Sequence, residues 1–152
     1  MITKPAVLSS TFMTFQVASI MQQCIDIARA HHTPFGAALV NEAGKVLVMA
    51  PNTTKIDGST AHAEMNVLKD ANKYPGEQLF LITTCEPCPM CAGAALWTKV
   101  KGIYFGASIE DASQFMKQID ISCQQVVDAS WVNIPVVSGI LKEECLELFR
   151  NR

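Results

Sequence analysis

Short apolar segments alternate with helical segments along most of this chain, and the alternation is the strongest constraint on its fold. The apolar segments have the length of strands and lie at about residues 36–40, 45–49, 79–83, 102–106 and 134–138. The helical segments lie at about residues 15–31, 61–72, 92–97, 110–118, 122–129 and 141–150. Because helices between strands cover both faces of a sheet, the sequence predicts a three-layer α/β/α fold around a mixed sheet with these five strands.

The order of the segments also predicts how the strands run. The turn Asn41-Glu42-Ala43-Gly44 separates the first two strands, which we therefore expect to form an antiparallel hairpin. Helices separate the later strands, which we expect to run parallel. The chain has 152 residues, of which 49% are hydrophobic and 17% charged, and this composition predicts one globular domain over residues 1–152.

Charge and hydropathy argue against several classes of protein. A net charge of −2 does not support a large nucleic-acid surface. The uncharged stretch from Pro5 to Ile25 contains many Ser, Thr and Gln residues, so we do not expect a membrane span. We also do not expect an export signal ending at Ala28-Arg29-Ala30, because this segment has the apolar face of a structural helix. The protein should therefore be cytoplasmic, with its cysteines reduced.

Three of the six cysteines are concentrated in the segment Cys85-Glu86-Pro87-Cys88-Pro89-Met90-Cys91. Cys88 and Cys91 are three residues apart and would share one face of a helix, for which Pro87 is a suitable start. A helix N-terminus favours thiolates, which are the form of cysteine that binds metals. The spacing alone leaves two interpretations open, a metal site and a thioredoxin-type redox pair.

His62, at the start of the preceding predicted helix, favours the metal site. Two helices joined through one strand can direct their N-termini at a common point, which makes His62 a third ligand beside Cys88 and Cys91. Three protein ligands leave one position open, the pattern of catalytic zinc, whereas structural zinc usually has four. Cys85 is the alternative fourth ligand, although Pro87 and the end of the strand separate it from the other two cysteines.

Glu64, two residues after His62, gives the predicted zinc site a group that transfers protons. Zinc bound by two thiolates is formally neutral and is a weaker Lewis acid than zinc bound by three histidines. A neighbouring carboxylate can take a proton from the water that the metal activates and deliver it to a substrate. The alternative interpretation is a solvated helix residue, which would be preferred without the histidine and the cysteines.

The segments His62-Ala63-Glu64 and Pro87-Cys88-Pro89-Met90-Cys91 match the zinc deaminase signature H-x-E…P-C-x-x-C. The chain resembles the cytidine-deaminase-like superfamily over nearly its whole length, beginning at Pro34-Phe35-Gly36-Ala37. The resemblance implies one Zn²⁺ per chain, with Glu64 as the proton shuttle and with three metal ligands, His62, Cys88 and Cys91. It also implies contacts to the substrate from six positions: Asn52, Phe35, Ala63, Glu86, Pro87 and Asp111. Asn52 matches an asparagine that binds a base edge, and its alternative role is that of a turn residue.

Two groups within the superfamily share further segments with the chain. Residues 34–37 and 85–91 resemble bacterial guanine deaminases, whereas residues 90–94, 102–107 and 138–145 resemble tRNA adenosine deaminases. Guanine deaminases of this type have an acidic purine contact after the fourth strand, for which Asp111 and Asp120 are the candidates. The tRNA enzymes usually need basic residues near the C-terminus, but residues 141–152 contain as many acidic as basic side chains.

We therefore expect a zinc-dependent hydrolase that deaminates a free nucleobase or a related amino-heterocycle, with guanine as the leading substrate. The alternatives are a tRNA adenosine deaminase, an enzyme for cytosine, pterin or triazine-type rings, and a catalytically silent interaction domain on this fold. We expect a homodimer, because members of the superfamily are commonly dimers or tetramers. The expected partner is a small heterocyclic base, with nucleic acid disfavoured.

Overall fold

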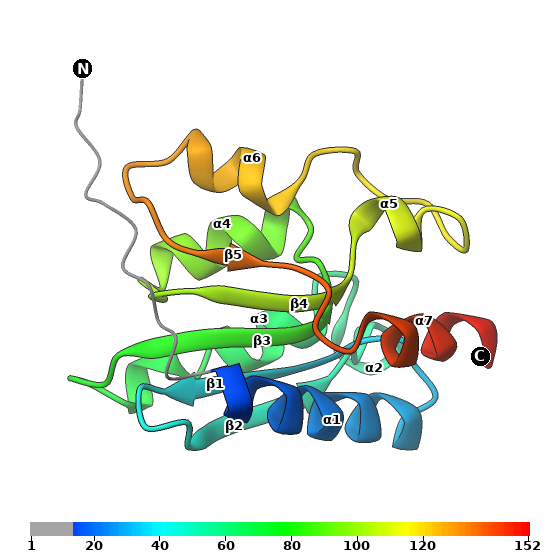
Figure 1. Ribbon diagram of the computed structural model, residues 1–152, viewed down its shortest axis with the longest axis horizontal. Helices are drawn as coiled ribbons and strands as arrows, with labels where there is room; N and C mark the ends of the chain where they lie inside the picture. The colour runs from blue at the N-terminus through cyan, green and yellow to red at the C-terminus, as the bar shows by residue number, and fades with distance from the viewer. Residues whose placement is uncertain (1–13) are drawn as a thin grey trace.

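The computed structural model describes residues 14–152, so the part of the predicted domain at residues 1–13 lies outside the described residues. The strands are β1 (Gly36–Asn41), β2 (Val46–Pro51), β3 (Leu79–Cys85), β4 (Ile103–Ala107) and β5 (Val136–Val137). The helices are α1 (Thr14–Ala30), α2 (Thr54–Asp57), α3 (Ala63–Leu68), α4 (Pro89–Trp97), α5 (Ile109–Ala112), α6 (Cys123–Asp128) and α7 (Lys142–Arg150), with a 3-10 turn, η2, at Ala71–Lys73. Figure 1 shows their arrangement.

The strands form one mixed sheet in the order β2-β1-β3-β4-β5. β1 pairs antiparallel with both β2 and β3, and β3, β4 and β5 run parallel. Every residue of β1 and β3 is buried, because helices cover both faces at the centre of the sheet. The predicted mixed sheet, with an antiparallel first hairpin and parallel later strands, is confirmed.

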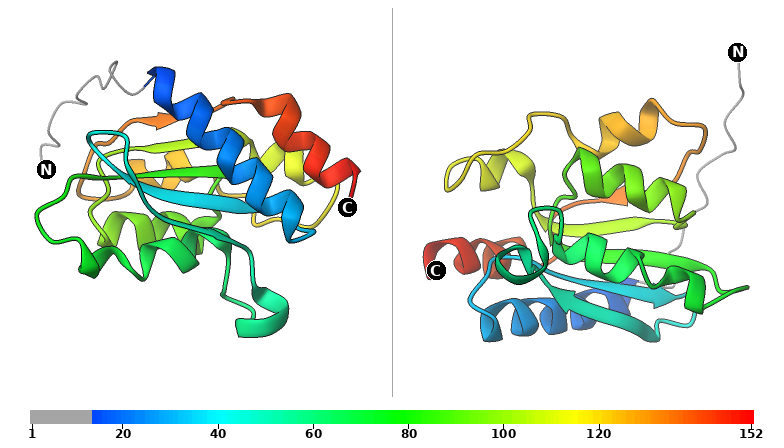
Figure 2. Two further views of the ribbon diagram at one scale, coloured as in Figure 1. Left: turned by 90° about the horizontal axis from the view of Figure 1, so that it is seen from below. Right: turned by 180° about the vertical axis from the view of Figure 1, so that it is seen from behind.

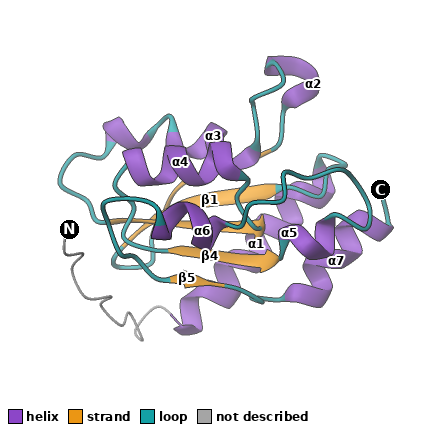
Figure 3. Ribbon diagram, turned by 90° about the horizontal axis from the view of Figure 1, so that it is seen from above, coloured by secondary structure: helices purple, strands orange, loops and turns teal. Residues whose placement is uncertain are grey.

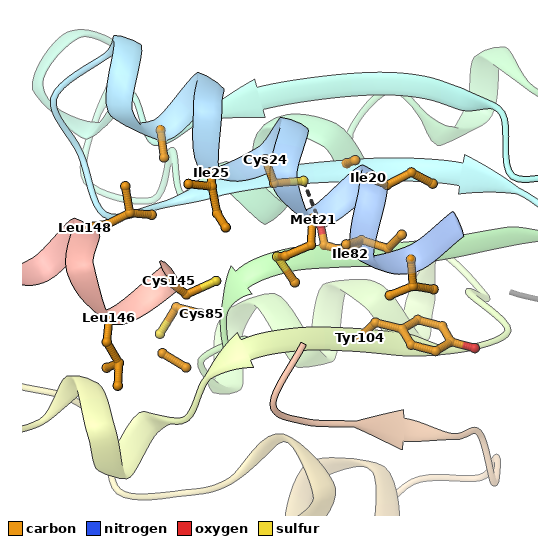
Figure 4. Close-up of a cluster of buried hydrophobic side chains, with 14 of the residues drawn as sticks. Ile20, Met21, Cys24, Ile25, Ile82, Cys85, Tyr104, Cys145, Leu146 and Leu148 are labelled. Atoms are coloured by element: carbon orange, nitrogen blue, oxygen red, sulfur yellow. Dashed lines mark hydrogen bonds between the residues drawn. The ribbon is translucent and has the colours of Figure 1, made fainter. Parts of the chain in front are cut away.

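Two helical layers enclose the sheet (Figure 2 and Figure 3). α1 and α7 pack on one face, and α3, α4 and α6 pack on the other. The core beneath α1 includes Met21 and Ile25, and the Cys24 thiol donates to the carbonyl oxygen of Ile82 across 3.8 Å (Figure 4). Cys85 and Cys145 complete this core at the end of β3 and on α7 (Figure 4). Within residues 14–152, no helix combines the length and hydropathy that a membrane span requires.

Several elements differ in extent from the sequence prediction. The helix expected over 61–72 ends at Leu68 and gives way to η2, and α4 begins at Pro89 rather than Ala92 because this proline occupies the first turn. The helix expected over 110–118 ends at Ala112. The residues after it, 113–122, instead connect α5 with α6 and pass beside a cavity at the end of β3.

Candidate active site

A cavity of about 440 Å³ opens where β3 ends and where the N-termini of α3 and α4 approach each other. Five separate segments of the chain supply its lining, which comprises Phe35, Asn52, Thr54, Ser59, His62, Glu64, Cys85, Glu86, Cys88, Met116, Lys117 and Gln118. Polar side chains therefore line a concave site of the size that small ligands use.

His62 and Cys88 occupy equivalent positions, as the N-cap residues of α3 and α4. Both have extended backbones, with ψ of 155° for His62 and 168° for Cys88, and neither side chain caps its own helix. Cys91 follows Cys88 by three residues, so its thiol is on the same side of α4 as that of Cys88. Pro89, and not Pro87 as predicted, is the proline at the first position of the helix.

The side chains of His62, Cys88 and Cys91 form a group suited to a metal ion, because all their ligand atoms lie within 4.8 Å of one another. His62 Nδ1 is 3.6 Å from Cys88 Sγ and 3.5 Å from Cys91 Sγ. A tetrahedral zinc ion, with bonds of about 2.05 Å to nitrogen and 2.3 Å to sulfur, requires nitrogen–sulfur separations of about 3.6 Å. The donor set and its spacing therefore fit the predicted zinc ion, with three protein ligands.

The pKa values of the two thiols in this group are shifted in opposite directions. A hydrogen bond from the Cys91 thiol lowers the pKa of Cys88 to about 4, and the same interaction raises the pKa of Cys91. The hydrogen bond with Cys88 also raises the pKa of His62, against the effect of burial. A second thiolate beside the first needs a cation to balance it, as zinc would provide.

Glu64 lies on the first turn of α3 and lines the cavity, although only 4% of its surface is exposed. The hydroxyl of Thr83, on β3, donates a short hydrogen bond to Glu64 Oε1. Burial raises the pKa of the Glu64 carboxyl above its ordinary value, while hydrogen bonds from Thr83 and Cys91 oppose the rise. Two residues at positions i and i+2 of a helix point to different faces. His62 is the N-cap residue, before the first helical residue, so this does not separate its side chain from that of Glu64.

Asn52 and Phe35, two of the expected substrate contacts, also line the cavity. Asn52 Oδ1 accepts hydrogen bonds from the amide nitrogen of Thr54 at 3.0 Å and from its hydroxyl at 2.9 Å. The ring of Phe35 meets that of Phe149 edge to face, with 5.5 Å between their centroids. Phe35 thus contributes both to the cavity wall and to the core.

Three other predicted contact residues do not line the cavity. Ala63 and Pro87 are buried beside it. The Asp111 carboxylate accepts from the amide of Ser108 at 3.1 Å and pairs with Lys142 at 3.4 Å. The structure therefore gives no support to a substrate contact by Asp111. Asp120, the second candidate for an acidic purine contact, is exposed and also lies outside the lining.

The cavity also uses residues that the sequence analysis does not select. Met116, Lys117 and Gln118 form one wall, because the helix expected over 110–118 ends early and leaves them in the connection to α6. Asn66, on α3, donates through Nδ2 to the carbonyl oxygen of Pro51 at 3.0 Å and to the Thr53 hydroxyl at 2.9 Å. These bonds fix the segment that carries Asn52.

Comparisons with known proteins agree with this geometry. Residues 15–107 match the cytidine and deoxycytidylate deaminase zinc-binding region. The guanine deaminase of Bacillus subtilis (strain 168) is 32% identical over 105 residues, which are 66% of this chain and 67% of the relative. The tRNA-specific adenosine deaminase of the same organism is 36% identical over 117 residues, which are 74% of this chain and 70% of the relative.

A solved structure of the guanine deaminase from Nitrosomonas europaea has the same fold. Its TM-score is 0.74 at 22% identity, and the alignment covers 99% of this chain and 88% of that chain. At this level of identity the likeness concerns the fold alone.

Zinc content provides a direct test of the ligand set. We expect about one zinc ion per chain in the wild type, and about tenfold or greater loss of affinity in His62→Ala or Cys91→Ser, because two ligands hold zinc poorly. Cys85→Ala is the matched control, since Cys85 lines the cavity but lies outside the three-residue group. Metal analysis after dialysis against a weak chelator measures the effect, and zinc loss from Cys85→Ala would show that the site has four ligands.

Proposed function

The chain belongs to the cytidine and deoxycytidylate deaminase zinc-binding family, and from this premise we propose that it deaminates a free purine base, with guanine as its substrate. The observation that carries the proposal is the cavity itself, whose lining includes His62, Cys88 and the buried Glu64. Its volume of about 440 Å³ suits a single bicyclic base. The similarity to a guanine deaminase supports the choice of guanine.

The reaction replaces the exocyclic amine on C2 of guanine with an oxygen from water, which forms xanthine and ammonia. Zinc held by the three ligands would supply the activation of that water. Glu64 takes a proton from the water as its oxygen adds to C2 and the C2–N3 double bond opens, with its electron pair moving to N3. Glu64 then donates a proton to the amine nitrogen. The C2–N bond breaks, and ammonia leaves. A carboxyl whose pKa is raised by burial is suited to both proton transfers near neutral pH.

Asn52 is the proposed contact to the edge of the base. Its Oδ1 is occupied by Thr54, and among the described residues its Nδ2 has no hydrogen-bond partner. Nδ2 therefore presents donors to the cavity, and these match acceptors of guanine such as O6 and N7. Phe35 supplies an apolar surface for the ring.

A tRNA adenosine deaminase is the second candidate, because a tRNA-specific enzyme is 36% identical to the chain. The lining of the cavity favours the free base, since its charged side chains are two glutamates and one lysine, Lys117. An RNA strand would be expected to require a more basic surface.

We also propose that the protein is a homodimer. Trp97 on α4 is 76% exposed and Trp131, after α6, is 45% exposed, with 4.7 Å between their ring centroids. Ile121 and Val126 extend this apolar groove between α4 and α6. Large exposed apolar patches commonly mark protein interfaces.

The six free cysteines are consistent with the proposed cytoplasmic location.

An ammonia-release assay tests the substrate. Guanine should release ammonia, whereas an anticodon stem-loop containing adenosine should release none. Release from the RNA alone would overturn the free-base proposal.

Glu64→Gln tests the proton-transfer role of the carboxylate. The variant should lower kcat by about 10³-fold or more while keeping zinc, because it loses the proton acceptor but retains the metal ligands. An active Glu64→Gln would overturn the proton-transfer role.

Thr83→Val tests whether the hydrogen bond to Glu64 orients the carboxylate. The substitution conserves the shape of the side chain but removes the hydroxyl, so we expect kcat to fall by about tenfold, the effect of losing one buried hydrogen bond to a charged group. Thr83→Ser should restore most of the rate. Equal rates in the valine and serine variants would show that the hydroxyl has no such role.

Sedimentation analysis of Trp97→Glu tests the dimer. The wild type should have the mass of two chains, and the variant should dissociate to monomers because the charge would be buried at the interface. Ile56→Glu on α2 is the control, since Ile56 is 85% exposed and lies outside the apolar groove. A monomeric wild type would contradict the proposal.

A further inference from the structure

Glu86 has an environment unlike that of a residue at a pocket rim. Only 9% of its surface is exposed, and each oxygen of its carboxylate accepts one backbone hydrogen bond. Oε1 accepts from the amide of Ile109 at 2.9 Å, and Oε2 accepts from the amide of Cys123 at 2.7 Å. One side chain therefore joins two segments that are separated along the chain by the connection between α5 and α6.

The two amides are the first in α5 and in α6, where a helix lacks internal acceptors. Ser108 and Ser122 form capping boxes at these helices, with Asp111 and Gln125 as their partners. Each box satisfies the amides of the N-cap residue and of the third helical residue, and it leaves the first helical amide without an acceptor. Glu86 supplies that acceptor for both helices at once.

This bridge fixes both ends of a wall of the cavity. Residues 113–122 run from the end of α5 to the start of α6, and Met116, Lys117 and Gln118 within this connection line the cavity. Glu86 lies two residues before Cys88, and its own amide donates to the carbonyl oxygen of Ala107 at 2.7 Å. The position of the wall is therefore set directly from the segment that carries the metal ligands.

The C-terminal segment also contacts the connection that forms the wall. Phe115 stacks on Phe149 of α7 at 5.5 Å between centroids, and Arg152, after α7, donates to the carbonyl oxygen of Phe115 at 2.9 Å. These contacts hold the connection from the C-terminal segment, whereas Glu86 holds it from the segment that precedes Cys88.

We propose that Glu86 is a positioning residue that holds the wall of Met116, Lys117 and Gln118 at a set distance from the metal-binding segment, and so controls binding of the base. Because both oxygens are used by backbone amides, Glu86 acts on the substrate through the wall and not by direct contact. The wall, with the exposed Lys117, then contributes to selection of the base. For its kinetic measurements this inference rests on the proposed function.

Glu86→Gln is the decisive variant, because glutamine has the same shape but only one acceptor oxygen. One of the two amides would then face an NH₂ group, so the wall should loosen. We expect KM for the base to rise by about tenfold, the effect of one lost hydrogen bond to a charged group, with kcat within about threefold of the wild type and zinc content unchanged. Glu110→Gln, which removes an exposed carboxylate from α5, should change neither constant.

Amide hydrogen exchange provides a measurement that does not depend on activity. The first amides of helices usually exchange fast, but in the wild type the amides of Ile109 and Cys123 should be protected from exchange. In Glu86→Gln at least one of these two amides should lose about tenfold or more of its protection. Retained protection, or a fall in kcat at constant KM, would overturn the proposal. A raised KM with retained protection would show direct contact with the substrate instead.

A second variant covers the case in which Glu86→Gln does not fold. Ser122→Ala breaks the capping box of α6 and keeps Glu86, so it should raise KM by about threefold through one end of the wall. An unchanged KM in Ser122→Ala would also overturn the proposal. If guanine is not the substrate, amide exchange still decides the role of Glu86, so the two proposals fail separately.

Discussion

Three donor atoms must lie within reach of one metal ion, and the structure achieves this by placing two helix starts side by side. His62 and Cys88 are N-cap residues with extended backbones, and their side chains do not cap their own helices. β3 and α4 follow α3 in the chain, so both helix starts lie at the same edge of the sheet. The position of the cavity, the direction of Glu64 and the role of Glu86 all follow from this arrangement.

Four helices near the cavity, α3, α4, α5 and α6, use their N-cap residues in two ways. At α5 and α6 the N-cap is serine, which satisfies the backbone in the ordinary manner. At α3 and α4 the N-cap residues are His62 and Cys88 of the candidate metal site, and these helices begin without a side-chain cap. Stability is thus given up at the helices that carry the candidate site and is retained at the helices on either side of the cavity wall. This division is expected where a site is built for chemistry.

The sequence predicts those parts of the protein that depend on local spacing. The metal ligands lie in two short motifs, and the alternation of strands and helices defines the layers, so the three-layer fold and the zinc-binding group follow from the chain alone. The contacts of Glu86 lie 23 and 37 residues away in the sequence, and no periodicity reports such pairs. The early end of α5 is a similar case, because Phe115, just after the helix, contacts Phe149 and Arg152, which are more than 30 residues away in the sequence.

Cys91 is fully buried, whereas Cys88 is half-buried and lines the cavity. An ion held between them therefore has the protein core behind it and the cavity in front of it. The path by which such an ion would enter or leave passes through the cavity, which is also the proposed binding site of the base. Metal retention and occupancy of the cavity would then be coupled, because a base bound there would stand in the path of the ion.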